Sequence, residues 1–245
     1  MDVVEGALWG LVGGGALVLG ALVAQAREMS AATIGRILAF GAGVLISALT
    51  FDLTEEAFKA GGTVPVAIGL VLGGAVFVVG DELIGRRQMR EDMRTGAMRE
   101  EQSDPTALAL GAVLDGIPES FVIGASVTQG EGVALPVVVA VFLSNVPESL
   151  SAAAGFRLRG WTGARSVGLW VSVAAVATIA AAVGALVADG LSADWFAGVN
   201  AFAAGAVLAM IADTMIPDAF REAGRGVGFV TVVGFALAFL LSTAS

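Results

Sequence analysis

Residues 114–120 read LDGIPES and residues 143–149 read LSNVPES, so the pattern Leu-x-x-(Ile/Val)-Pro-Glu-Ser occurs twice. Each copy lies in an apolar run long enough to cross a bilayer as a helix. A proline inside a helix leaves the carbonyl four residues earlier without its partner. A glutamate at mid-membrane is costly and needs a compensating partner. We therefore expect these two stretches to decide both the fold and its chemistry.

The composition around the two motifs indicates an integral membrane protein. The 245 residues are 57% hydrophobic and 14% charged, and the mean hydropathy is +0.87. Soluble domains carry about 25% charged residues. The sequence contains no cysteine and no histidine, which excludes disulfides, imidazole ligands and Ser-His or Cys-His catalysis. It has no basic footprint for nucleic acid. We expect neither an enzyme nor an organic cofactor.

The apolar runs predict an all-α fold of eight transmembrane helices within one transmembrane domain, residues 1–245. The predicted helices cover residues 7–26, 31–59, 63–81, 106–126, 133–156, 164–188, 195–220 and 227–242. Residues 82–105, rich in arginine and acids, are predicted to form the one long loop.

The distribution of basic residues predicts the orientation in the membrane. Of the 13 Lys and Arg residues, Lys59 alone falls on the side of the predicted helices that also holds the two termini. Lys and Arg collect on the cytoplasmic side. We therefore predict a multi-pass protein of the cytoplasmic membrane, with both termini outside and the loop of residues 82–105 in the cytoplasm.

A longer repeat relates the two halves of the chain. Residues 40–58 read FGAGVLISALTFDLTEEAF, and residues 202–220, 162 positions later, read FAAGAVLAMIADTMIPDAF. The charge count gives these two helices opposite directions, which is typical of the inverted repeats of transporters. The predicted layout is three helices, a central pair and three inverted helices, a 3+2+3 arrangement. The alternative is chance similarity between helices rich in Ala, Gly and Val.

The two motifs place oxygen ligands near the middle of the membrane. Asp115 precedes Glu119 by four residues, and Ser144 precedes Glu148 by four, so each pair shares one helix face. If the two helices face each other, these side chains form a ring of oxygens that contains no cation. Unpaired anions in a low dielectric bind protons or cations. A cation site is the simplest interpretation.

Further acids lie toward the ends of the two repeated helices. They are predicted to mark a transport pathway. Three would lie near the outer mouth, namely Asp52, Glu55 and Glu56. Two would lie near the inner mouth, namely Asp213 and Asp218. Other interpretations stay open: the prolines as simple kinks, the serines as polar contacts between helices, a glutamate as a protonated structural group, and the outer acids as solvated helix ends.

On these motifs the sequence resembles the ZIP family of divalent-metal transporters, in its bacterial-type branch. The family pattern His-Asn-x-Pro-Glu-Gly corresponds to residues 115–120, and a Gln-Asn-x-Pro-Glu-Gly pattern corresponds to residues 144–149. The resemblance implies that Glu119 and Glu148 bridge a two-metal centre. It implies that Asp115 replaces a histidine ligand and Ser144 a glutamine ligand, and that Asn145 contributes to the second metal. Gly116 departs from the pattern, since it replaces an asparagine.

These observations predict a transporter that moves divalent cations into the cytoplasm. The oxygen ligands suit Mn²⁺, Mg²⁺ or Fe²⁺ better than Zn²⁺, although Zn²⁺ also accepts carboxylates. The expected substrate is therefore Zn²⁺, Mn²⁺ or Fe²⁺, and the expected partners are the lipid bilayer and the metal. A homodimer is left open. The alternatives are a relative that binds metal or regulates without transport, a proton-coupled carrier of another substrate, and an intramembrane hydrolase that uses Asp115 with Asp213.

Overall fold

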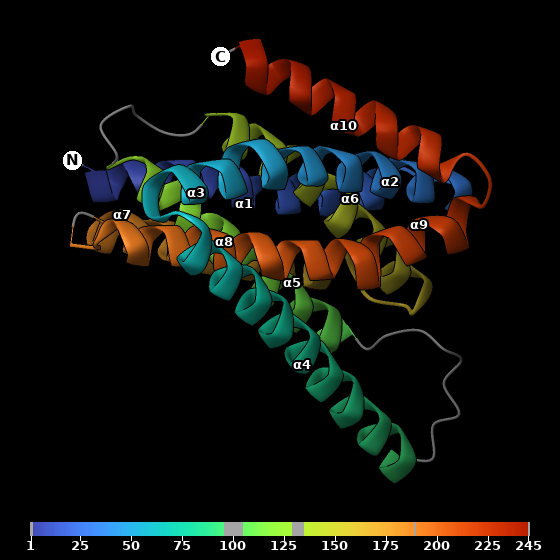
Figure 1. Cartoon of the computed structure of the whole chain (residues 1–245). Coiled ribbons are helices and arrows are strands. Elements are labelled where there is room, and N and C mark those ends of the chain that lie inside the picture. The colour runs from blue at the N-terminus through green and yellow to red at the C-terminus, as the bar shows by residue number, and fades with distance from the viewer. Residues whose placement is uncertain (1, 96–104, 129–134, 189, 245) are drawn as a thin grey trace.

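The computed structural model describes the backbone of residues 2–95, 105–128, 135–188 and 190–244, and these residues form helices without any strand. Figure 1 shows them as one bundle, from which α4 inclines away. The α-helices are α1 (Asp2–Ala26), α2 (Ala31–Ala48), α3 (Glu55–Gly61), α4 (Thr63–Thr95), α5 (Pro105–Ser126), α6 (Leu135–Leu158), α7 (Gly163–Ala188), α8 (Ala193–Met210), α9 (Ile216–Ala223) and α10 (Val227–Ala244). Two π-helical segments, η1 (Leu49–Thr54) and η2 (Ile211–Met215), join α2 to α3 and α8 to α9.

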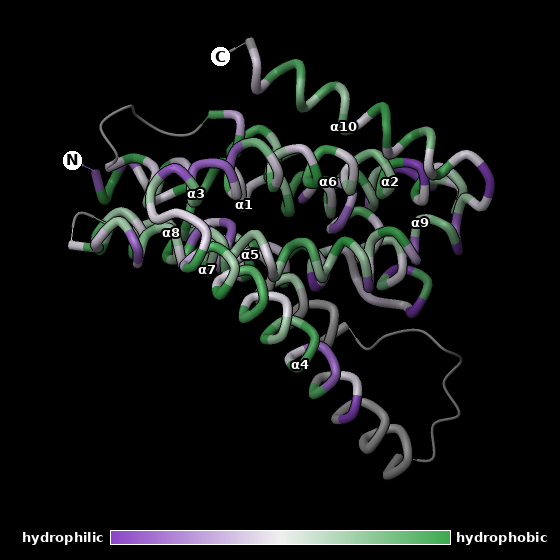
Figure 2. Tube along the Cα trace, in the orientation of Figure 1, coloured by the Kyte–Doolittle hydropathy of each residue, from purple (hydrophilic) through white to green (hydrophobic). Residues whose placement is uncertain are grey.

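Six helical stretches among the described residues are long and apolar enough to cross a membrane. They are Asp2–Ala26, Ala31–Gly61, Thr63–Leu83, Leu135–Leu158, Gly163–Ala188 and Ala193–Ala223. Figure 2 shows that these stretches are mainly hydrophobic along their length, and that hydrophilic residues gather near helix ends and turns. The chain is a helical, multi-pass membrane protein. The other two predicted spans correspond to α5 and to the shorter apolar helix Val227–Thr243, and the total of eight stays a prediction.

Helix boundaries recur at the 162-residue offset of the sequence repeat. Ser30 caps α2 by accepting a hydrogen bond from the backbone N–H of Thr33 at 3.2 Å, and Ser192 caps α8 in the same way for Trp195 at 3.4 Å. The two helical runs end at Gly62 and Gly224, which both have a positive φ that favours glycine. The π-helical segments fall at matching places within the runs. Both copies therefore use the same caps and the same internal irregularity.

The two copies of the repeated helix cross in opposite directions. α2 packs against α9, and α3 packs against α8, so the beginning of one copy meets the end of the other. Figure 1 shows the run from α2 to α3 antiparallel to the run from α8 to α9. Opposed copies of one helical unit are what an inverted repeat requires.

The helices pack mainly within two groups. The first helix group contains α1, α5, α6 and α7, in which α1 packs on α6 and α7, and α5 packs on α7. The second helix group contains α2, α3, α4, α8, α9 and α10, in which α4 packs on α8 and α10 packs on α2. Contacts between the groups are made chiefly by α2 with α6 and by α5 with α8.

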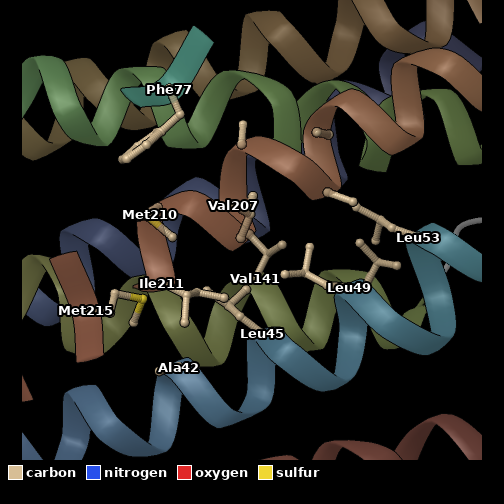
Figure 3. Close-up of a cluster of buried hydrophobic side chains, with 14 of the residues drawn as sticks. Ala42, Leu45, Leu49, Leu53, Phe77, Val141, Val207, Met210, Ile211 and Met215 are labelled. Carbon is tan, nitrogen blue, oxygen red and sulfur yellow. The ribbon is translucent and has the colours of Figure 1, made fainter. Parts of the chain in front are cut away.

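A layer of buried apolar side chains fills the space between the two helix groups. Figure 3 shows the part of this interface layer where α2, α6 and α8 meet. Its members include Leu45, Leu49, Leu53, Val122, Ile123, Val138, Val141, Val207 and Ile211. Because these side chains are buried, the layer joins the two helix groups by apolar packing.

The predicted loop of residues 82–105 starts later than expected. α4 continues through Thr95, so residues 82–95 are helical. Glu82 and Arg86 form an ion pair of 2.6 Å at i,i+4 spacing, and arginine, glutamate and methionine are good helix formers. The polar composition that suggested a loop therefore belongs to an extension of the helix. Residues 96–104 lie outside the described residues.

Candidate metal site

The two motifs lie within α5 and α6, with Pro118 and Pro147 inside the helices as predicted. The two helices of the expected central pair, α5 and α6, do not pack mainly on each other. α5 makes most of its contacts with α7, and α6 makes most of its contacts with α1, whereas α5 and α6 touch each other only slightly. Most of the packing of the two motif helices is therefore made by α1 and α7.

Glu119 and Glu148 form a pair of acidic side chains inside the helical bundle. Glu119 is 5% exposed, and Glu148 is partly buried. The carboxyl groups of Glu119 and Glu148 lie close enough together to interact electrostatically. The ion pairs found among the described residues involve Glu28, Glu55, Glu82 and Asp218 instead. The charge of the pair is thus not compensated by any described Lys or Arg.

Ser144 and Asn145 are buried beside this pair on α6, at 2% and 6% exposure. The Ser144 hydroxyl donates to the backbone oxygen of Val141 at 3.0 Å. The Asn145 side chain donates from Nδ2 to the backbone oxygen of Gly13 at 3.0 Å, which ties α6 to α1. Because both side chains use a donor in these bonds, the Ser144 oxygen and the Asn145 Oδ1 retain lone pairs for a cation.

Asp115 and Gly116 occupy the same turn of α5, just before Pro118. The backbone of Asp115 is helical, and its side chain lies outside what the structure describes. Gly116 is buried, yet a Cβ atom added there would meet none of the described atoms within 4 Å. Open space therefore lies beside the backbone of α5 one turn before Glu119. Among the side chains that the structure describes, no three His, Cys, Asp or Glu residues gather as a metal cluster.

The predicted outer acids lie apart from the glutamate pair. Asp52, on η1, accepts a hydrogen bond from Ser242 of α10 at 2.8 Å. It lines a cavity of about 10 Å³ whose other walls include Val44, Ala140 and Leu143. Glu55 is exposed and pairs with Lys59 at 2.7 Å. Glu56, beside it on α3, is also exposed.

The predicted inner acids also lie outside the glutamate pair. Asp213 is exposed on η2. Asp218, on α9, is partly buried and pairs with Arg221 at 2.9 Å. The structure thus places Glu119 near Glu148, with Ser144 and Asn145 about one turn before Glu148 on α6. The five acids that were predicted to mark a pathway lie elsewhere, on η1, α3, η2 and α9.

Two polar features of the second helix group were not predicted from the sequence. Ser242, in the last predicted helix, is the donor that holds Asp52. Asn200 of α8 is buried, and neither of its side-chain atoms has a hydrogen-bond partner. A lone Asn within the apolar run of residues 195–212 was the available signal for the second feature.

The fold and the acidic pair together define a class: helical, multi-pass membrane proteins with carboxylates inside their spans. No protein-family model matches the chain. The chain is 28% identical to the zinc transporter ZIPB of Bordetella bronchiseptica, in an alignment that covers 97% of this chain and 80% of that protein. This distant similarity over nearly the whole chain supports the resemblance to the ZIP family, and it supports metal transport at the level of that family.

Proposed function

We propose that this protein is a ZIP-like transporter that carries divalent cations across the cytoplasmic membrane into the cytoplasm. The observation that carries the proposal is the pair of Glu119 and Glu148 inside the bundle, one from each motif copy. The two acids lie close together and have no cationic partner among the described residues. A divalent cation is the compensation that two close carboxylates require in a low dielectric.

The other candidate ligands come from the same two motifs as the glutamate pair. Ser144 and Asn145 offer neutral oxygens on α6, and Asp115 adds a carboxylate one turn before Glu119. A set rich in oxygen favours Mn²⁺ or Fe²⁺, while similarity to a zinc transporter favours Zn²⁺. The acids at the helix ends, Asp52, Glu55, Glu56, Asp213 and Asp218, would attract cations to the two mouths of the pathway.

The packing in two helix groups supports alternating access. The glutamate pair belongs to the first helix group, and the interface layer lies between the groups. Movement of one group against the other would open the pair to each side in turn.

The test is metal uptake by the purified protein in proteoliposomes, with Zn²⁺, Mn²⁺ and Fe²⁺ measured separately. The Glu119→Gln, Glu148→Gln double variant should abolish uptake because it removes both negative charges. The matched control is the Glu28→Gln, Glu222→Gln double variant, which makes the same charge change at exposed positions and should retain uptake. Uptake that persists in the first double variant removes the site assignment.

A second function, metal binding without transport, is favoured by one observation. Gly116 offers no side-chain ligand at a buried position of the site. Titration calorimetry on the same samples distinguishes the two functions. Binding that depends on Glu119 and Glu148, together with an absence of flux in the unmodified protein, would indicate a regulatory or sensing role.

A further inference from the structure

Asn200 is a buried polar side chain that has no bonding partner in the described part of the chain. It lies on α8 at 1% exposure, and both Nδ2 and Oδ1 are unbonded. An unmade hydrogen bond of a buried group costs about 1–3 kcal/mol, and buried polar groups in native proteins are bonded as a rule. Packing alone would be served better by leucine, so the amide at this position requires another explanation.

Asn200 lies in the middle of the α8 face that looks toward the first helix group. Ala204, Val207 and Ile211 follow it by four, seven and eleven residues, and all three belong to the interface layer. Residues at these spacings share one face of a helix. The amide is therefore directed at the layer between the two helix groups, and not at lipid or at α4.

The register of α8 on α5 brings Asn200 close to the level of the glutamate pair. Phe196, one turn before Asn200, packs in a cluster with Ala125 of α5, and the two helices run in opposite directions (Figure 1). One turn further along α8 corresponds to about Phe121 or Val122 on α5. Glu119 lies on the same face of α5 as Val122, so it is within roughly 10 Å of Asn200 along the helix axes.

We infer that Asn200 supplies an amide oxygen to the cation as it passes between the outer mouth and the Glu119–Glu148 pair. The inference rests on the proposed transport function. Amide oxygens are ligands for hard divalent cations. The orientation predicted from the basic residues places the Ala125 end of α5 toward the outside, so Asn200 lies on the outer side of Glu119.

The unbonded state of Asn200 follows from the closed conformation. With the interface layer packed, the amide faces apolar side chains, and it meets water and the ion only when the two helix groups separate. A neutral oxygen binds a divalent cation more weakly than a carboxylate does, because it contributes no charge. Asn200 would thus hold the ion briefly and pass it to the glutamate pair.

Ser47 of α2 is the matched control. Its hydroxyl is also buried and unbonded. It shares a helix face with Gly43 and Phe51, four residues before and after it, and these contact α10. Ser47 therefore lies inside the second helix group, away from the interface layer. The Ser47→Ala variant should leave the half-saturating metal concentration unchanged.

The experiment measures uptake against metal concentration in proteoliposomes, and thermal stability in detergent, for the Asn200→Leu variant. We expect unchanged or higher stability, because buried unbonded atoms are removed. We also expect the half-saturating concentration to rise roughly fivefold or more, since one ligand oxygen is lost. An unchanged half-saturating concentration overturns the inference, and so does a parallel loss of stability and uptake, which indicates a structural role.

If the Asn200→Leu variant does not fold, the Asn200→Asp variant tests the inference that Asn200 is a ligand. A carboxylate at this place should lower the half-saturating concentration and slow the maximal rate, because the ion leaves it less readily. A half-saturating concentration equal to or above that of the unmodified protein overturns the inference. If the unmodified protein takes up no metal, the proposed function and the inference fail together. If the unmodified protein takes up metal and the Asn200 variants have an unchanged half-saturating concentration, the inference fails and the proposed function stands.

Discussion

Glu119 and Glu148 lie where two short motifs bring acidic side chains into apolar helices, and their neighbours are oriented by bonds to the backbone. The Asn145 amide is fixed by its bond to the carbonyl of Gly13. Such a bond holds Oδ1 in place before a cation arrives, which lowers the entropy lost on binding. α1 thus contributes to the candidate site without supplying a side-chain ligand.

The open space beside Gly116 leads to a prediction about affinity. The Gly116→Asn variant should lower the metal concentration needed for half-maximal uptake, because it adds an amide oxygen at a buried position where a Cβ meets none of the described atoms within 4 Å. We expect a change of about tenfold, equivalent to roughly 1.4 kcal/mol. The measurement is uptake against metal concentration, with calorimetry as a direct check on binding.

The control for this variant is Gly168→Asn on α7, where a Cβ would also meet open space but where the residue is exposed. It should transport like the unmodified protein. Equal half-saturating concentrations for Gly116→Asn and Gly168→Asn would mean that residue 116 does not face the ion.

The sequence predicted the central residues of the candidate site, because proline and glutamate are conspicuous inside apolar runs. The pairing of Glu119 with Glu148 follows from their equal positions in two repeated motifs. Asn200 was not predicted, since a single asparagine in an apolar helix usually bonds to a neighbouring helix, and only packing reveals that it does not. The bond from Asn145 to Gly13 was also hidden, because it joins segments 132 residues apart.

At the level of elements, the two π-helical segments are the irregular part of the repeated helices. η1 carries Asp52 and η2 carries Asp213. π-helical turns occur often at functional sites, because the extra residue shifts side chains around the helix. Both segments lie next to the interface layer, to which they contribute Leu49, Leu53 and Ile211. The irregularity therefore places an acid and a residue of the interface layer on the same turn.

Glycine-mediated helix contacts lead to a prediction about stability. A Cβ at Gly205 of α8 would clash with the carbonyl of Leu70 on α4, whereas a Cβ at Gly198 of the same helix would meet open space. Gly205→Ala should lower the free energy of unfolding by about 1–3 kcal/mol, as overpacking does. Gly198→Ala should leave the free energy of unfolding unchanged or raise it, because alanine favours the helix. Thermal unfolding in detergent compares the two, and equal melting temperatures would contradict the packing described for α4 and α8.

Helix boundaries were predicted closely where apolar runs end at caps. Residues 195–220 were expected to be helical, and the structure has α8, η2 and α9 over residues 193–223. The sequence could not indicate η1 or η2, since a π turn depends on local insertion and not on apolar periodicity. The extension of α4 to Thr95 was missed because its composition resembles a solvated loop, while its i,i+4 charge pair favours a helix.

For the whole molecule, the division into two helix groups predicts that a covalent link between them stops transport. Leu45 of α2 and Val141 of α6 face each other in the interface layer (Figure 3). Because the chain has no cysteine, the Leu45→Cys, Val141→Cys variant contains only the introduced pair. A thiol-specific cross-linker should abolish uptake, and a cleavable version should allow recovery after reduction.

The control pair is Leu17→Cys with Val173→Cys, which belongs to one cluster inside the first helix group. Cross-linking there should leave most of the uptake intact, since α1 and α7 are expected to move together. If both cross-links block uptake equally, the two helix groups do not move as separate units.

Because the chain has no native cysteine, single introduced cysteines can also test the predicted orientation. Asp194, where a cysteine is introduced as Asp194→Cys, is exposed in the first turn of α8. Arg225, the site of Arg225→Cys, is exposed in the turn between α9 and α10. An impermeant maleimide should label residue 194 in intact cells and residue 225 only after the membrane is opened, because basic residues gather at the cytoplasmic end. Labelling in the reverse order would place both termini in the cytoplasm.

The cavity beside Asp52 has a consequence for the choice of ion. Its volume of about 10 Å³ is room for a single water molecule. On the proposed transport path, an ion that passes Asp52 in this conformation has to shed most of its hydration shell before it reaches the carboxylate. Mg²⁺ gives up its water reluctantly, so it would be rejected by slow dehydration even where the oxygen ligands suit it. Discrimination would then depend on the rate of water exchange as well as on affinity.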